Sequence, residues 1–354
     1  MPPVTIRDVA RKAGVGIGTV SRVINSHPSV SDVTRQAVEQ AIVELNFSPN
    51  PSARRLSLGK TLNIAVVAPF FTRPAFVERL RGVVTALAET PYDVVVYNVE
   101  TTQQRDRYLI ELSRRDRCDG LLIMALAPTD VEAKRLLTGV PTVLLDCYHL
   151  DFNRVVIDDV AGGYLAAQHL LDLGHRRIGF VSDSPASPFG FVASRYRLQG
   201  YQRALREANV MTPPAYHAVT SQHGVPEARE AGLALLDLPE PPTAIFAASD
   251  TQAIGVMQAA RTRGLRVPED LSVIGYDDID LAEFLHLTTV HQPLFASGVE
   301  AVELLLDAIE HPGAPPREIR PELRLIVRQT TAPLATPAAN AQASSLILAS
   351  FTTA

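Results

Sequence analysis

Aspartates recur along the chain directly after short apolar runs, and each run is typical of a buried β-strand. They are Asp146 after Val-Leu-Leu, Asp158 and Asp159 after Val-Val-Ile, Asp250 (with Ser249) after Ile-Phe-Ala-Ala, and Asp277 and Asp278 after Val-Ile-Gly-Tyr. One aspartate at such a place usually caps a helix or a turn. In open parallel sheets, however, ligands bind outside the carboxyl ends of the strands. Four such places therefore favour a ligand cleft over unrelated caps.

The chemistry of these side chains indicates the class of ligand. Ionised carboxylates only accept hydrogen bonds, so they favour a sugar-like ligand, rich in hydroxyl groups, over a phosphate. Arg197 opens a helix after a Pro- and Phe-rich loop and can donate a fork of hydrogen bonds to paired hydroxyls or a carboxylate. Phe70, Phe71 and Phe76 can supply apolar walls, and stacking must come from Phe or Tyr because the chain has no Trp.

The N-terminal residues carry a different chemistry. Residues 1–60 contain eight Lys and Arg and four acids, a net charge of +4, whereas the whole chain carries −5. A basic head on an acidic body suits a module that contacts nucleic-acid phosphates. The apolar spacing predicts one helix over residues 6–13, which Thr5 caps, a turn at Gly14 and a second helix over 19–24. This is the helix-turn-helix arrangement, although any three-helix domain needs such a turn, and a third helix follows Ser31.

Residues 46–60 connect this head to the rest of the chain. Two prolines break the third helix, and residues 52–58 can form a short helix ended by Gly59. Arg54, Arg55 and Leu56 suit a minor groove, with the leucine as a wedge between base steps. Composition alone ranks a flexible cationic linker higher.

From Leu62 onward, apolar runs alternate with segments of helical spacing as far as residue 276, a pattern typical of parallel sheets covered by helices on both faces. Such a length exceeds one doubly wound sheet and predicts two lobes. No phosphate-cradling, nucleophile-elbow or dinucleotide motif occurs in a fitting context, so the sequence argues against an enzyme. The sequence shows no signal-like or membrane-spanning segment, so we expect a cytoplasmic protein without a membrane partner. Its two isolated cysteines, Cys118 and Cys147, predict buried thiols, and we expect no metal or cofactor.

Several motifs in fixed order resemble the LacI/GalR family of bacterial transcription regulators over residues 4–332. In the head and linker they are Thr5-Ile-Arg-Asp-Val-Ala, Ala13-Gly-Val, Thr19-Val-Ser-Arg-Val-Ile-Asn and Pro49-Asn-x-x-Ala-Arg-Arg-Leu. In the core they are Arg197-x-x-Gly-Tyr, Ala247-Ala-Ser-Asp, Val273-Ile-Gly-Tyr-Asp-Asp and Thr288-Thr-Val-x-Gln. The chain departs from the family pattern in both parts. In the head, Gly16 replaces a capping serine, and Ile17 and Gly18 carry no hydrogen-bonding side chain where the family reads bases. In the core, Ser249 and Asp159 replace frequent asparagines.

The resemblance implies a helix-turn-helix head over residues 1–50, a hinge helix over 51–60 and a two-lobed, periplasmic-binding-protein-like α/β core over 61–332. Lobe 1 would comprise about 61–160 and 292–320, lobe 2 about 161–291 and 321–332, and 333–354 would be a disordered tail. The implied DNA-binding residues are Thr5, Ile17, Gly18, Thr19, Ser21, Arg22, Asn25, Ala53, Arg54 and Leu56. The implied effector-binding residues are Phe71, Phe76, Asp146, Arg197, Ser249, Asp250 and Asp277.

The function implied is that of a homodimer, or a higher oligomer, that represses transcription from a pseudo-palindromic operator. A mono- or oligosaccharide between the lobes would change their orientation and the affinity for DNA. The alternatives are a stand-alone sugar-binding protein and an α/β enzyme without a DNA role.

Overall fold

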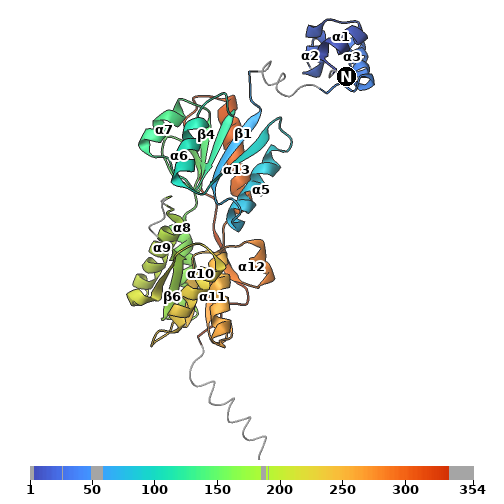
Figure 1. Cartoon of the computed structure of the whole chain (residues 1–354). Helices are drawn as coiled ribbons and strands as arrows, with labels where there is room; N and C mark the ends of the chain where they lie inside the picture. Colours follow the sequence, from blue (N-terminus) through green and yellow to red (C-terminus); the bar gives the residue numbers. More distant parts are fainter. Residues whose placement is uncertain (1–3, 26, 49–58, 185–188, 190, 335–354) are drawn as a thin grey trace, which may run out of the picture. The chain divides into compact units, whose positions relative to one another are not determined.

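The computed structural model describes residues 4–25, 27–48, 59–184, 189 and 191–334 (Figure 1). The chain divides into two compact units, Met1–Leu62 and Asn63–Ala354, which are treated separately below. Residues 53, 54 and 56, which the resemblance assigns to DNA, and residues 335–354 lie outside the described ranges.

The head consists of α1 (Ile6–Ala13), α2 (Ile17–Ile24) and α3 (Asp32–Glu44). At the start of α1, the Asp8 carboxylate accepts hydrogen bonds from the backbone N–H and the hydroxyl of Thr5, at 3.0 and 2.7 Å. Gly14 ends α1 in the left-handed conformation, with φ 66°, which glycine adopts without steric cost. The three helices share a small core of buried residues, which are Val9, Ala10, Val20, Val23, Val38 and Ala41. The predicted helix-turn-helix is therefore confirmed.

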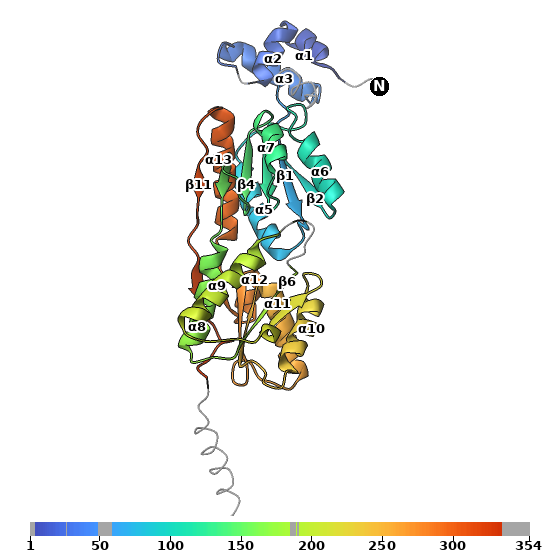
Figure 2. The same cartoon turned by 90° about the vertical axis from the view of Figure 1, so that its left-hand side faces the viewer.

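Lobe 1 of the second unit is built on a parallel sheet with the order β11-β5-β4-β3-β1-β2. Its strands are β1 (Asn63–Pro69), β2 (Asp93–Val99), β3 (Gly120–Met124), β4 (Thr142–Leu145), β5 (Asn153–Val155) and β11 (Glu318–Ile319). Helices α5 (Pro74–Leu87) and α13 (Leu294–Glu310) cover one face, and α6 (Thr102–Glu111) and α7 (Asp130–Leu137) cover the other. Figure 2 shows the late-sequence helix α13 among the elements of this lobe.

Lobe 2 has a second sheet, with the order β12-β10-β9-β8-β6-β7. Its strands are β6 (Ile178–Asp183), β7 (His217–Thr220), β8 (Ala244–Ala247), β9 (Ser272–Asp277), β10 (Thr288–His291) and β12 (Arg324–Ile326), of which β12 pairs antiparallel to β10. Helices α8 (Asp159–Asp172) and α9 (Ala193–Glu207) cover one face, and α10 (Val225–Leu236) and α11 (Asp250–Thr262) cover the other. A 3-10 turn (Pro214–Tyr216) and the short helix α12 (Asp280–Phe284) complete the lobe.

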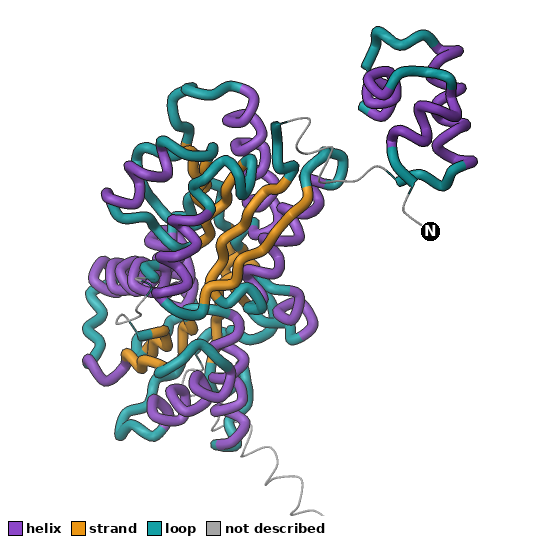
Figure 3. The backbone as a smooth tube through the Cα atoms, turned by 45° about the horizontal axis from the view of Figure 1, so that its top comes forward, coloured by secondary structure: helices purple, strands orange, loops and turns teal. Residues whose placement is uncertain are grey.

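The chain passes between the lobes at several points far apart in sequence. It leaves lobe 1 between β5 and α8, returns between β10 and α13, and leaves again between β11 and β12. Figure 3 shows the strands of the two sheets as separate groups, each enclosed by helices. The two-lobed α/β class predicted from the alternation is confirmed, although the predicted alternation ends at residue 276 and does not include the strands β10, β11 and β12.

Helices α8 and α9 pack closely enough to fix the backbone of the region that carries Arg197. A Cβ atom added to Gly200 would lie 2.0 Å from the carbonyl oxygen of Val160, and one added to Gly163 would lie 2.1 Å from the carbonyl oxygen of Arg197. Contacts that short are sterically impossible, so glycine is required where the two backbones approach. In the described ranges, no helix is long and apolar enough to cross a membrane.

Candidate functional site

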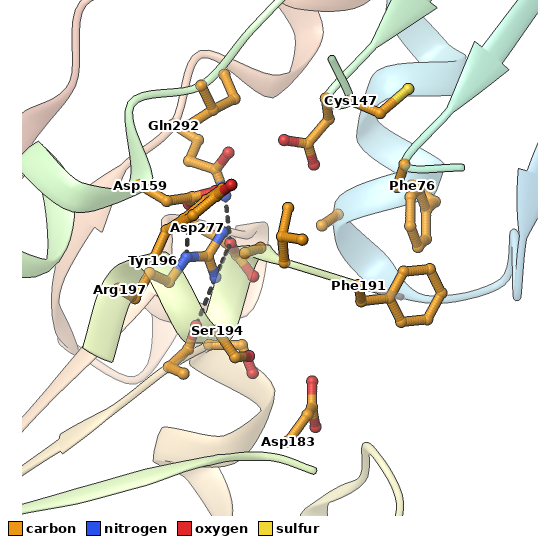
Figure 4. A pocket seen from close by; sticks show the side chains of 18 of the residues that line it. Phe76, Cys147, Asp159, Asp183, Phe191, Ser194, Tyr196, Arg197, Asp277 and Gln292 are labelled. Atoms are coloured by element: carbon orange, nitrogen blue, oxygen red, sulfur yellow. Dashed lines mark hydrogen bonds and ion pairs between the residues drawn. The ribbon is translucent and has the colours of Figure 1, made fainter. Parts of the chain in front are cut away.

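A cavity of about 340 Å³ lies where the carboxyl ends of strands from both sheets meet. Such a volume falls within the range of small-molecule pockets, roughly 300 to 1,000 Å³. Asp146 follows β4, Asp277 ends β9, Phe76 lies on α5 and Arg197 on α9, so both lobes contribute to the wall (Figure 4). The rule that ligands bind beyond the strand ends therefore applies to both sheets at once.

Arg197 is buried at one side of this cavity and is held by two carboxylates. Its Nε donates to Asp159 Oδ1 at 2.8 Å, and its Nη1 donates to the carbonyl oxygen of Ala248 at 2.5 Å and lies 3.5 Å from Asp277 Oδ1. The guanidinium also stacks over the Tyr276 ring, 3.7 Å from its centroid. Burial lowers the pKa of Arg197, but the carboxylates of Asp159 and Asp277 reverse this and raise it, so the group stays charged.

A chain of hydrogen bonds between residues that line the cavity connects the two lobes. Arg79, on α5 of lobe 1, donates to Asp146 Oδ2 at 2.5 Å and to Gln292 Oε1 at 3.1 Å. Gln292 in turn donates to Asp277 Oδ1 of lobe 2 at 2.6 Å. The side chains of Arg79 and Gln292 are each 2% exposed, so this amide links two buried charges of opposite sign. Any change in the relative position of the lobes must alter these bonds.

The buried carboxylates of Asp159 and Asp277 have pKa values that differ from those of ordinary surface carboxylates. Burial raises the pKa of Asp159 and of Asp277, and the guanidinium of Arg197 lowers both and offsets part of the rise. Since each carboxylate keeps lone pairs that the arginines do not use, both can accept hydrogen bonds from ligand hydroxyls. The arrangement is therefore suited to binding a polar neutral molecule.

The structure brings most of the predicted effector residues together. Asp146, Arg197, Ser249, Asp277 and Phe76 line the cavity. The backbone of Asp146 and Asp277 is left-handed, with φ 59° and 114°. Such values are uncommon outside glycine and are typical of strained positions at binding sites.

Asp250 and Phe71 do not line the cavity in the described structure. The Asp250 carboxylate accepts from the Thr289 hydroxyl at 2.6 Å and from the Ile279 N–H at 2.9 Å, so it joins strands and loops instead. Burial raises its pKa well above the ordinary value. Phe71 packs against the hydrophobic core of lobe 1. Both residues therefore support the site from outside.

Other cavity residues were not singled out from the sequence. Arg79 lies at helical spacing in a charged stretch, and Gln292 was noted only as part of a motif. Both are brought to the site by contacts between segments more than 200 positions apart. Residues Arg73, Asp183, Tyr196 and His223 also line it. Cys147 lies there too, and burial raises its pKa to about 12, which leaves an unreactive thiol.

Among the predicted DNA contacts of the head, Ile17, Gly18 and Thr19 lie in the first turn of α2, Arg22 lies in its last turn, and Asn25 follows as the C-cap. Ile17 is 46% exposed, Gly18 and Arg22 are exposed, and nothing lies within 4 Å of a Cβ added to Gly16 or Gly18. In the described part of the head, no carboxylate lies within 4 Å of Arg22. Thr5 is exposed, whereas Thr19, Ser21 and Asn25 are half-buried.

Comparisons with known proteins give the same two-part division. Residues 5–50 match the model of "Bacterial regulatory proteins, lacI family", and residues 167–331 match a "Periplasmic binding protein-like domain". The ribose operon repressor of Escherichia coli (strain K12) is 38% identical over 315 residues, which cover 87% of this chain and 94% of the relative.

Solved structures of similar proteins match the chain as well. The Lac repressor dimer bound to operator and the anti-inducer ONPF has a TM-score of 0.80 and 29% identity, covering 93% of this chain and 99% of that one. A LacI family transcriptional regulator from Enterococcus faecium with bound ribose has a TM-score of 0.68 and 32% identity, covering 77% and 100%. The chain therefore belongs to the LacI family of bacterial regulatory proteins, and it is a DNA-binding transcriptional regulator rather than an enzyme.

Proposed function

We propose that the chain is a repressor whose affinity for operator DNA is controlled by a sugar bound in the cavity between the lobes. The observation that carries the proposal is the hydrogen-bonded chain Arg79–Gln292–Asp277, because it joins the lobes within the wall of the cavity. A ligand that contacts Asp146 on one side and Arg197 and Asp277 on the other favours one relative orientation of the lobes. It can therefore shift an equilibrium between DNA-binding and non-binding states.

The carboxylates support a neutral, hydroxyl-rich effector. Asp146, Asp159 and Asp277 accept hydrogen bonds, and the Arg197 Nη2 atom has no protein hydrogen-bond partner among the described residues. A sugar supplies donors to the carboxylates and an acceptor to this nitrogen. A ribose-bound relative and a ribose operon repressor agree with this class of ligand.

The DNA side of the proposal rests on the head. We assign Ile17, Gly18 and Arg22 to the major groove, with Arg22 as the hydrogen-bonding reader, since the side chains of the first two offer only apolar contact or close approach. Thr5, Thr19, Ser21 and Asn25 flank them. Two heads of a homodimer would occupy the halves of a pseudo-palindromic operator in the bacterial cytoplasm, on the nucleoid.

The segment between head and core completes the mechanism. Residues 51–60 would form a hinge helix on operator DNA, with Ala53 and Arg54 against the backbone and Leu56 as a minor-groove wedge. A helix this short gains its ordering free energy only when both hinges meet the duplex. An effector that changes the orientation of the lobes would separate the hinges and release the DNA.

The proposal is tested with the full chain and with a variant that lacks residues 1–60. Operator sites are first selected from random duplexes, and binding is then followed by fluorescence anisotropy in the presence of a panel of neutral sugars. We expect one sugar to weaken operator binding at least 10-fold, and the shortened variant to keep its sugar affinity without DNA binding. Tighter DNA binding with sugar would reverse the sign to a co-repressor. A chain that binds no duplex at low salt would overturn the proposal.

A control variant separates ligand response from folding. Arg197→Met removes the guanidinium between Asp159 and Asp277. It should abolish the sugar response while the head still binds operator. A normal response in this variant would remove Arg197 from the effector site.

A further inference from the structure

Arg73 differs from the other two described arginines of the cavity because no described carboxylate pairs with it. It precedes α5 as the N-cap residue and is half-buried, with its guanidinium 4.3 Å from the centroid of the Phe70 ring. In the part of the chain that the structure describes, no carboxylate lies within 4 Å of this guanidinium and it donates no hydrogen bond. Arg79 and Arg197, in contrast, are each paired with aspartate.

Asp183 faces this arginine from lobe 2. It is the last residue of β6, and its side chain is 31% exposed. Oδ1 accepts hydrogen bonds from Gln252 Nε2 at 3.0 Å and from the Thr220 hydroxyl at 3.3 Å. Oδ2 accepts from His223 Nδ1 at 3.0 Å and keeps an unused lone pair. In Figure 4 the Asp183 carboxylate points into the space that the drawn side chains surround, apart from the Arg197 group.

The charges of Arg73 and Asp183 interact electrostatically across a gap, without a direct ion pair. Burial lowers the pKa of Arg73 and the Asp183 carboxylate raises it. Both residues line the same cavity as Arg197 and Asp277, and both also line an adjoining cavity of about 740 Å³. One ligand in the first cavity can therefore reach both ends. The gap between Arg73 and Asp183 spans the two lobes.

We propose that Arg73 and Asp183 form a second recognition pole of the effector cavity, at which one hydroxyl group of a neutral ligand accepts a hydrogen bond from Arg73 and donates one to Asp183. The inference rests on the proposed function and adds the specificity of the same site. A hydroxyl group that accepts a hydrogen bond from lobe 1 and donates one to lobe 2 links the lobes at this pole, as the Gln292 amide does elsewhere in the cavity wall. The ligand therefore forms hydrogen bonds at both of its ends, with Arg197 and Asp277 at one and with Arg73 and Asp183 at the other.

The charges of the cavity select against anionic ligands. Its described lining holds the carboxylates of Asp146, Asp159, Asp183 and Asp277 against the guanidiniums of Arg73, Arg79 and Arg197, a formal net charge of −1. Among these three described arginines, Arg73 is the one that no carboxylate pairs with, and a phosphate drawn to it would lie against the Asp183 carboxylate. Like charges in a partly buried site repel strongly. We therefore assign the site to neutral sugars and not to their phosphates.

The test is isothermal titration calorimetry of the full chain with a panel of neutral mono- and disaccharides, including D-ribose, D-glucose and cellobiose, and with ribose 5-phosphate and glucose 6-phosphate. For the tightest neutral sugar, Arg73→Met should weaken binding about 10- to 100-fold, as expected for the loss of a charged hydrogen bond. Asp183→Asn should weaken this binding by a similar factor. Because it removes a negative charge, it should also reduce the ratio of the affinity for neutral sugars to the affinity for sugar phosphates. Arg73→Lys should restore part of the affinity.

Arg81→Met is the matched control, because Arg81 lies on α5, the helix that Arg73 precedes, is 59% exposed and pairs with Glu78 outside the cavity. It should change the affinity less than about 3-fold, as an exposed pair contributes little. Unchanged affinity in Arg73→Met, while Arg197→Met loses binding, would overturn the second pole and leave the proposed function intact. Phosphates that bind more tightly than the neutral sugars would overturn it as well. If the unaltered chain binds none of the neutral sugars, the proposed function fails and this inference fails with it.

Discussion

Replacing Gln292 by Met tests the bridge between the lobes directly. The substitution keeps the size and apolar stem of the side chain but removes the acceptor for Arg79 Nη2 at 3.1 Å and the donor to Asp277 Oδ1 at 2.6 Å. Each hydrogen bond to a charged group contributes roughly 1.5–3 kcal/mol. Arg79 keeps Asp146 and Asp277 keeps Arg197, so the loss is limited by these remaining pairs. We expect the free energy of unfolding of the core to fall by about 3 kcal/mol.

The measurement is urea and thermal denaturation followed by far-UV circular dichroism, since the chain contains no Trp for a fluorescence probe. A loss of this size corresponds to a Tm lower by roughly 6–12 °C for a domain of this length. Gln258→Met on the exposed face of α11 is the control and should stay within about 0.5 kcal/mol. A loss below about 1 kcal/mol for Gln292→Met would refute the reasoning, because two buried charges would then be indifferent to their shared amide.

Three further outcomes follow from the structure and the proposed mechanism. Burial lowers the pKa of His169, His175 and His217 from 6.5, so these histidines take up protons in the unfolded chain first, and their contribution to stability falls as the pH drops through about 6.5. The raised pKa values of Asp159, Asp250 and Asp277 act in the opposite direction, so the histidine contribution is measured against a variant. Between pH 8 and 5 the urea midpoint of the unaltered chain should fall further than that of His169→Gln, and parallel profiles would contradict it. Gly200→Ala should force α8 and α9 apart, lower Tm by several degrees and weaken sugar binding in calorimetry, and an unchanged Tm would exclude the clash. Leu56→Ala should impair selected operator binding far more than binding to random duplex in anisotropy titrations, whereas equal losses would make the segment a simple tether.

Sequence analysis predicts the site residues whose position follows from the local pattern of a polar residue directly after an apolar strand. Asp146 and Asp277 follow apolar runs, and the position of ligands beyond parallel strands is sufficient to place them at the cavity. Asp250 obeys the same local pattern, yet its carboxylate is taken up by Thr289 and the Ile279 backbone. The local pattern predicts a polar group at the strand end but not which way its side chain turns.

The part that the sequence does not predict depends on long-range packing. Arg79 and Arg81 occupy equivalent charged positions on one helix, but α13 covers the first and leaves the second exposed. That packing is close, because a Cβ added to Gly298 would lie 2.2 Å from the Arg79 carbonyl oxygen. Contacts between segments so far apart leave no trace in local periodicity. Arg73, Asp183 and His223 were missed for the same reason.

The repeated passage of the polypeptide between the lobes limits how such regulators can diversify. Neither lobe is encoded by an uninterrupted stretch of gene, since α13 and β11 return to lobe 1 after most of lobe 2 has been laid down. A single crossover between β10 and α13, for example, would give each sheet one edge strand, β11 or β12, from the other parent. New effector preferences are therefore expected to arise by point substitution within the cavity. The DNA-reading head, encoded by one continuous leading segment, is the portion that evolution or an engineer can exchange as a block.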